Sequence, residues 1–116
     1  MVDSARDLLQ SGESAVVIFT DGREFRHSHD GSGKTGFWKM NPKRSVDKVI
    51  IYRRDRSLDT NEVWTATPVG VIPAPARYPG RYIIKLSNVK FAGTTDEKWP
   101  TFAQTRQYPI RYLKKS

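Results

Sequence analysis

The chain contains a glycine-rich run, Gly31-Ser32-Gly33-Lys34-Thr35, with the composition of a phosphate-binding loop. Such a loop also needs a glycine at position 28, which is Ser28 here, and a helix after the Lys-Thr pair whose amide groups face the phosphates. Instead, Gly36 follows directly, and Asn41-Pro42 would end any helix soon after it. We therefore expect no nucleotide hydrolysis, and we predict that Asp30 to Gly36 forms a flexible, basic loop beside a binding site.

Two histidines precede that loop, in the run His27-Ser28-His29-Asp30. Histidines two positions apart share one face of a strand, and a metal site would need a third ligand, for which Asp30 or Asp21 is a candidate. The alternative is that both histidines are exposed at a strand end. The sequence contains no nucleophile elbow, and its carboxylates are scattered. We therefore predict no catalytic residue, no metal and no cofactor.

Aromatic and basic residues gather in the same part of the chain. Eleven of the thirteen aromatic residues lie at or after Phe37, and residues 63–116 carry nine Lys or Arg against two acids. Residues 1–62 are nearly balanced, with eleven Lys or Arg against ten acids. Because phosphates bind to cations and bases stack on rings, this combination favours a nucleic-acid partner. The alternative is that the rings form the core and the charge confers solubility.

Trp38 is the most informative ring, because it lies between the glycine-rich loop and Lys43-Arg44. A tryptophan on a loop is costly to expose unless it covers or binds something. Trp38 therefore either stacks on a base or closes one end of the core, and the sequence leaves both interpretations open. Trp64 lies in a predicted strand, as a core residue would, whereas Trp99 precedes a proline in a predicted loop and is a candidate pocket wall.

The composition limits the class of protein. With 116 residues, a formal net charge of +8 and a pI near 10.0, the chain is expected to form one domain that prefers polyanions. The absence of cysteine excludes disulfides and thiolate metal sites and fits a reducing compartment, so we predict a cytoplasmic protein. The longest apolar run, Ala15 to Phe19, is too short to span a membrane, and the polar start is not a secretory signal. No basic amphipathic helix is visible, so we predict no membrane partner.

Short strands separated by Gly and Pro turns dominate the predicted secondary structure. We expect a short helix at residues 4–10 and strands at 13–20, 23–29, 46–54, 62–72, 81–89 and 108–113, with Asp21-Gly22 as the hairpin turn between the first two strands. Residues 92–107 are predicted as a loop with a helical turn near 101–104. The pattern predicts a mainly β (α+β) single domain over residues 1–116, with an N-terminal helix (1–12), a small twisted β-barrel (13–113) and a tail (114–116). We expect five to seven strands in the barrel, with one or two short helices.

Six short features follow one another along residues 13–113: a loop with Trp38, then Asn41-Pro42, Asp47-Lys48-Val49-Ile50-Ile51-Tyr52-Arg53, Val69-Gly70-Val71-Ile72, Tyr82-Ile83-Ile84-Lys85-Leu86 and Pro109-Ile110-Arg111-Tyr112. This order resembles that of the PUA-like superfamily, particularly its EVE and ASCH branches. The family pattern has a glycine before the aspartate, where this chain has Val46. The resemblance implies a PUA-like pseudobarrel with a cleft that binds RNA, or a flipped and often modified base in DNA or RNA.

The resemblance also implies roles for individual side chains. Trp38 would stack on the base, with Lys34, Thr35 and Arg53 near the rim of the cleft and with Trp64 and Trp99 as secondary rings. Other exposed cations would contact phosphates. The predicted nucleic-acid-binding residues are Lys34, Thr35, Trp38, Lys39, Lys43, Arg44, Arg53, Arg54, Arg77 and Trp99.

Two other classes of function stay open at this point. The chain could be a small enzyme that acts on a nucleoside or an amide through residues 27–35. It could also be a protein-interaction module that uses the proline-rich connection Pro73–Pro79 and exposed edge strands. The sequence does not distinguish RNA from DNA, name a modified base, or give the oligomeric state.

Overall fold

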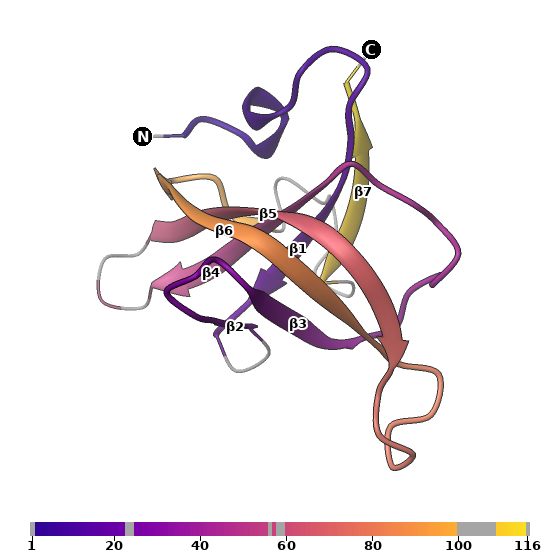
Figure 1. The fold of residues 1–116 in the computed structure, drawn as a ribbon. Coiled ribbons are helices and arrows are strands. Elements are labelled where there is room, and N and C mark those ends of the chain that lie inside the picture. Colours follow the sequence, from indigo (N-terminus) through magenta and orange to yellow (C-terminus); the bar gives the residue numbers. More distant parts are fainter. Residues whose placement is uncertain (1, 23–24, 56, 58–59, 100–108, 116) are drawn as a thin grey trace.

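A computed structural model describes residues 2–22, 25–55, 57, 60–99 and 109–115, and these form one mixed sheet of seven strands (Figure 1). The strand order is β2-β3-β6-β5-β4-β1-β7. Only the β1–β4 pair is parallel, and the other neighbours are antiparallel. The strands are β1 (Ser14–Thr20), β2 (Phe25–His27), β3 (Gly33–Trp38), β4 (Lys48–Asp55), β5 (Thr60–Pro73), β6 (Tyr82–Thr95) and β7 (Ile110–Lys114).

The prediction of a mainly-β domain is confirmed, but the prediction of a closed barrel is wrong. The sheet has two edges, β2 and β7, and these do not pair with each other. The predicted helix at residues 4–10 is a single 3₁₀ turn, η1 (Ala5–Leu8), which is the only helix that lies wholly within the described residues. The predicted helical turn at 101–104 lies outside the described residues.

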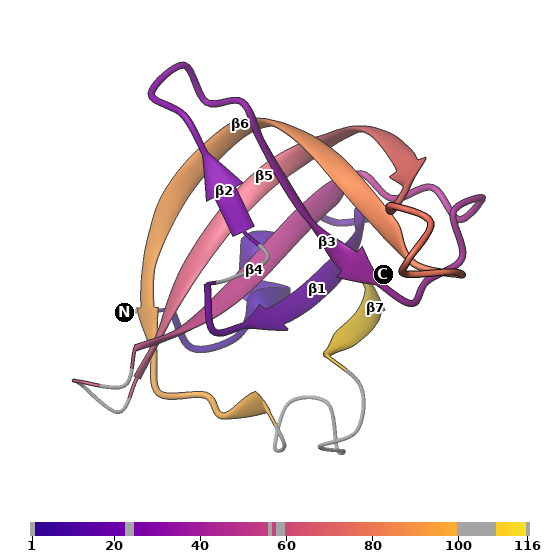
Figure 2. The same ribbon diagram turned by 90° about the horizontal axis from the view of Figure 1, so that it is seen from below.

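The sheet is strongly curled, as Figures 1 and 2 show, and one of its two hydrophobic cores lies on the inner side of the curl. Strands β2 and β3 lie at one end of the strand order and β1 lies near the other, yet their side chains pack in one cluster, so the sheet must bend around it. We call this cluster the concave core. Its buried members are Val16, Ile18, Phe25, Trp38, Val49, Ile51, Ala66, Ile84 and Leu86.

A second cluster, the convex core, covers the opposite face of the central strands. The segment with η1 and the segment that follows β6 pack over it, and it lies over β1, β4, β5 and β7. Because β1 and β4 contribute alternate side chains to both cores, their interiors are apolar without interruption. The buried members are Ala5, Leu9, Ala15, Val17, Ile50, Tyr52, Val63, Trp99 and Leu113.

The predicted hairpin between the first two strands does not form. β1 pairs with β4 and β7 on its two sides, which leaves no free edge for β2. β2 pairs instead with β3, and the residues of β3 include most of the segment that we expected to be a flexible loop. The two glycines of β3 serve close packing rather than flexibility. A Cβ on Gly33 would lie 2.5 Å from the carbonyl oxygen of Arg26, and one on Gly36 would lie 2.8 Å from Ile83 Cγ1.

Tyr52 ties both covering segments to the sheet. The backbone N–H of Ala5 donates a 2.9 Å hydrogen bond to the Tyr52 hydroxyl, and that hydroxyl donates to Glu97 Oε1. Asn61 Nδ2 also donates to the Glu97 carbonyl oxygen, at 2.9 Å. These bonds fix the segment that carries Trp99, because Glu97 lies two residues before it.

Candidate nucleic-acid interface

Trp38 is a core side chain, which resolves the alternative left open by the sequence. It is 6% exposed and packs in the concave core. Its Nε1 donates a 3.0 Å hydrogen bond to the hydroxyl of Thr35, which is itself buried. Neither side chain is on the surface, so stacking on a base by Trp38 and a rim position for Thr35 do not fit this structure.

Trp99 is likewise buried, at 4% exposed, in the convex core. Its ring stacks on Phe19 with centroids 5.7 Å apart, and it meets Tyr52 edge-on. Instead of forming a pocket wall, Trp99 closes the core beneath the segment after β6.

The seven predicted basic residues are all exposed, but they do not form a single patch. Lys43 and Arg44 lie together on the loop after β3. Arg53 forms an ion pair with Glu62 at 3.3 Å, near the other end of β4, and Arg54 follows it. Lys34 lies within β3 and Lys39 directly after it, whereas Arg77 lies in the β5–β6 connection with its guanidinium 5.2 Å from the Tyr78 ring.

The loop that carries Lys43 and Arg44 is held by local hydrogen bonds. The side-chain oxygen of Asn41 accepts from the Lys43 amide at 3.0 Å, and its backbone carbonyl accepts from the Arg44 amide at 3.2 Å. At the other end of the loop, Asp47 accepts from the amide of Ser14 at 2.9 Å. The Asn-Pro pair therefore makes a turn that presents two successive cations next to β1.

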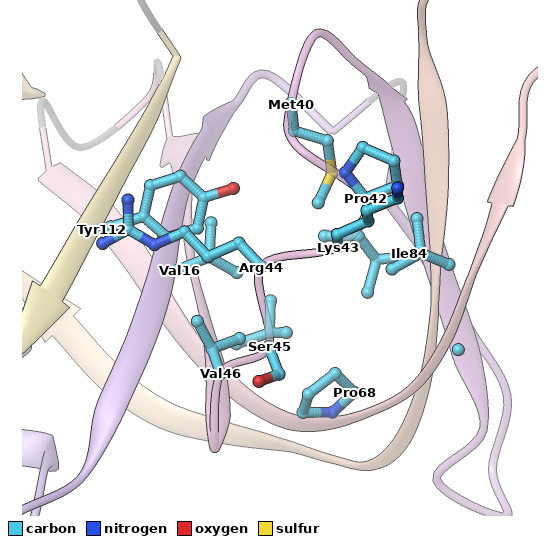
Figure 3. Close-up of a pocket in the computed structure, with 13 residues that line it drawn as sticks. Val16, Met40, Pro42, Lys43, Arg44, Ser45, Val46, Pro68, Ile84 and Tyr112 are labelled. Carbon is cyan, nitrogen blue, oxygen red and sulfur yellow. The ribbon is translucent and has the colours of Figure 1, made fainter.

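This loop covers a cavity of about 300 Å³ that opens at one end of the concave core (Figure 3). The walls are mostly apolar, and Lys43, Arg44 and Ser45 supply polar groups from the loop. The volume is at the lower end of the range for small-molecule sites. The cavity is lined by Val16, Met40, Pro42, Lys43, Arg44, Ser45, Val46, Val49, Pro68, Gly70, Val71, Ile84 and Tyr112.

Tyr112 supplies a polar group that nothing in the described residues satisfies. Its hydroxyl oxygen is buried and has no hydrogen-bond partner in that part of the chain. Figure 3 shows the ring at the side of the cavity with the hydroxyl directed between the surrounding side chains. The guanidinium carbon of Arg44 lies 3.9 Å from the centroid of the ring, a cation–π contact that orients both groups. A buried, unpaired hydroxyl costs free energy unless a ligand satisfies it.

A line of aromatic side chains centres on Trp64 of β5, which pairs with Ile51 in the middle of β4. The His27 and Trp64 ring centroids are 4.7 Å apart, and those of Trp64 and Phe91 are 5.2 Å apart. Phe25 also contacts both His27 and Trp64, since side chains two positions apart on a strand share a face. Phe91 is 54% exposed, and His27 is exposed too, so two rings of this line are open to solvent.

Residues 27–35, which the enzyme alternative would use, do not converge. His27 and His29 are both exposed, and Thr35 is buried. Among the described residues, no three His, Cys, Asp or Glu side chains group as they would around a metal. The amide and hydroxyl of Ser32 both donate to the carboxylate of Asp30, which lowers the pKa of that carboxyl.

No described helix is long and apolar enough to cross a membrane.

Comparison of the chain with protein-family models, with curated proteins and with solved structures gave no match.

Proposed function

We propose that this protein is a nucleic-acid-binding module with a PUA-like arrangement, in which the cavity beside Tyr112 receives an extruded or single-stranded base. The observation that carries the proposal is the buried Tyr112 hydroxyl without a partner in the described residues, beside two exposed cations. A base has apolar faces and a hydrogen-bonding edge, so it complements apolar walls that carry a single unpaired hydroxyl.

The charge around the cavity favours a base that is part of a nucleic acid. Lys43 and Arg44 are exposed at the loop that covers the cavity. A phosphodiester next to the bound base would meet these cations, and the formal net charge of +8 supports attraction at longer range. In this arrangement the cavity distinguishes the base and the loop positions the backbone.

The proposal is tested by removing one oxygen atom with Tyr112→Phe. We expect affinity for short single-stranded oligonucleotides, measured by fluorescence anisotropy, to fall about three- to tenfold, the effect of one hydrogen bond. The fold should be unchanged or more stable by up to about 1 kcal/mol, because the buried hydroxyl has no partner in the described residues to lose.

Tyr82→Phe is the matched control, because it deletes the same atom from a half-buried tyrosine that does not line the cavity. It should leave affinity unchanged. Equal affinity of wild type and Tyr112→Phe for every RNA and DNA oligonucleotide would overturn the assignment of the cavity. Oligonucleotide binding that is undetectable at low salt would overturn the function itself.

A further inference from the structure

Three cations lie directly opposite one another on neighbouring strands. Arg26 on β2 pairs with Lys34 on β3, and Lys34 pairs with Lys85 on β6. We call these three residues the cation row. All three are exposed, and directly opposed Cβ atoms in antiparallel strands lie about 4.5–5.5 Å apart.

The cation row faces away from the concave core. Thr35 and Ile84, the next residues along β3 and β6, are buried on the concave side. Since side chains alternate along a strand, Lys34 and Lys85 point to the opposite, convex side. The row therefore lies on a different face of the sheet from the Tyr112 cavity, in the part formed by β2, β3 and β6 (Figure 1).

The repulsion within the cation row lowers the stability of the sheet, and no ion pair among the described residues compensates it. Like charges directly opposite each other destabilise a sheet. Among those residues, ion pairs join Lys48 to Glu13 and Arg53 to Glu62, and none of them involves the cation row. Lys34 is the middle member and has a cation on either side. Such a row is favourable when an anion with several charges lies across it.

The surface beside the row is open and partly apolar. On β5, the position opposite Lys85 is Gly70, where a Cβ would have no atom within 4 Å, so the row continues into a gap. Val69, directly before that glycine, and Ile72, two residues after it, are 60% and 43% exposed. Val69, Ile72 and Ile83 line a groove of about 650 Å³ together with the cation row.

We propose that the cation row binds the sugar-phosphate backbone of a nucleic-acid strand, as a second surface separate from the base cavity. A backbone carries negative charges at regular intervals, so a nucleic-acid strand that crosses β2, β3 and β6 would bring its phosphates near cations that repeat on adjacent strands about 4.8 Å apart. The apolar side chains beside the row would contact the sugars. This inference rests on the proposed function for the choice of nucleic acid as the partner. The strand register of β2, β3 and β6 gives the position of the binding surface.

The test compares two double variants with the same change in charge. Lys34→Gln/Lys85→Gln removes two members of the row, and Arg6→Gln/Lys114→Gln removes two exposed cations from η1 and β7. Anisotropy titrations with a labelled oligonucleotide, as a single strand and as a duplex, are carried out at several salt concentrations. We expect the row variant to lower the slope of log K against log salt by roughly 1.4 for a single strand or 1.8 for a duplex. The form that shows the change is the form that lies on the row.

The outcomes separate this inference from the proposed function. If Tyr112→Phe weakens binding while the row variant has the wild-type slope, the cation row is not a binding surface but the cavity assignment stands. If the row variant lowers the slope and Tyr112→Phe has no effect, the row stands and the cavity assignment fails. An equal loss of slope in the Arg6/Lys114 control would attribute the effect to net charge and overturn the row. Tighter row-dependent binding to anionic phospholipid vesicles than to either oligonucleotide would overturn the choice of partner.

Discussion

Burial decides the role of a tryptophan in this protein more than its neighbours in the sequence do. Trp38 lies next to a basic loop, as a stacking ring would, yet the bond from its Nε1 to Thr35 satisfies its polar atom inside the core. Exposed rings lie elsewhere, among them Phe91 and Tyr78. The sequence does not show that Phe91 is exposed, because strands usually alternate buried and exposed positions and a phenylalanine is expected at a buried one.

Trp38→Ala is therefore expected to act on stability. Removing a large ring from a packed core should lower the free energy of unfolding by about 3–5 kcal/mol, measured by denaturant titration. Trp38→Phe should cost less, because it retains much of the packing and loses the bond to Thr35. Weaker oligonucleotide binding by folded Trp38→Ala at unchanged stability would contradict the core assignment and restore a stacking role.

At the scale of elements, β3 shows how a glycine-rich segment can be a strand. Gly33 lies opposite His27, where the two backbones approach so closely that a Cβ would lie 2.5 Å from the Arg26 carbonyl oxygen and 3.2 Å from His27 Cα. The partner β2 is short and lies at the edge of the sheet, so few other contacts hold it. Glycine is required here because the two backbones approach so closely.

Gly33→Ala should separate β2 from β3. We expect a loss of about 1–3 kcal/mol in unfolding free energy, as for other overpacked sites, together with faster amide exchange in Phe25–His27. Gly70→Ala is the matched control, since its Cβ would meet nothing and its φ is outside the left-handed region. It should be neutral or stabilise by about 0.4–1 kcal/mol. Equal melting temperatures for the two variants would show that the close approach is not required.

The sequence predicts the strands better than their partners. The apolar runs around Val16 and Ile50 correctly predict strands, because both faces of β1 and β4 are buried. The pairing of β1 with β4 and β7 depends on residues far apart in the chain, and the local turn signal at Asp21-Gly22 gave the wrong partner. Local turn preference is a weak constraint once both edges of a strand are occupied.

In the candidate sites, too, the sequence predicts local features better than contacts between residues far apart in the chain. The sequence identified Lys43 and Arg44 as a basic pair that follows Trp38, and in the structure they lie beside a cavity. It did not identify Tyr112, because only the folding of β7 beside β1 brings that ring to the same cavity. The cation row was missed in part for this reason too. Lys34 was predicted as a binding residue, but its opposition to Arg26 and Lys85 is a property of register.

At the scale of the whole molecule, the two cores have different surroundings: the concave core adjoins the proposed binding cavity, and two chain segments cover the convex core. The concave core contributes walls to the cavity, and Trp64 of the aromatic line packs against it. The convex core is closed by two chain segments far apart in sequence, which meet at Tyr52. None of the described residues of these covering segments lines the Tyr112 cavity or the groove beside the cation row, so binding there need not disturb the bonds of Tyr52.

Tyr52 should make the stability of the whole fold sensitive to alkaline pH. Burial, and then the hydrogen bond to Glu97 and its negative charge, raise the pKa of the Tyr52 hydroxyl far above its ordinary value. The folded state therefore keeps this proton at a pH where the unfolded chain, with a tyrosine pKa of about 10, releases it. The contribution of this hydroxyl to the free energy of unfolding is fully present below about pH 10 and is lost as the pH rises further.

Tyr52→Phe should lower the unfolding free energy at neutral pH by about 1–3 kcal/mol, because Ala5 N–H and Glu97 lose their partner. The variant should also show a smaller fall in unfolding free energy above pH 10 than wild type does. Denaturant titrations across that pH range measure both effects, with Tyr82→Phe as the control that should retain the fall. A wild-type stability that is constant above pH 10, or an equal fall in Tyr52→Phe, would show that this hydroxyl does not join the two covering segments to the sheet.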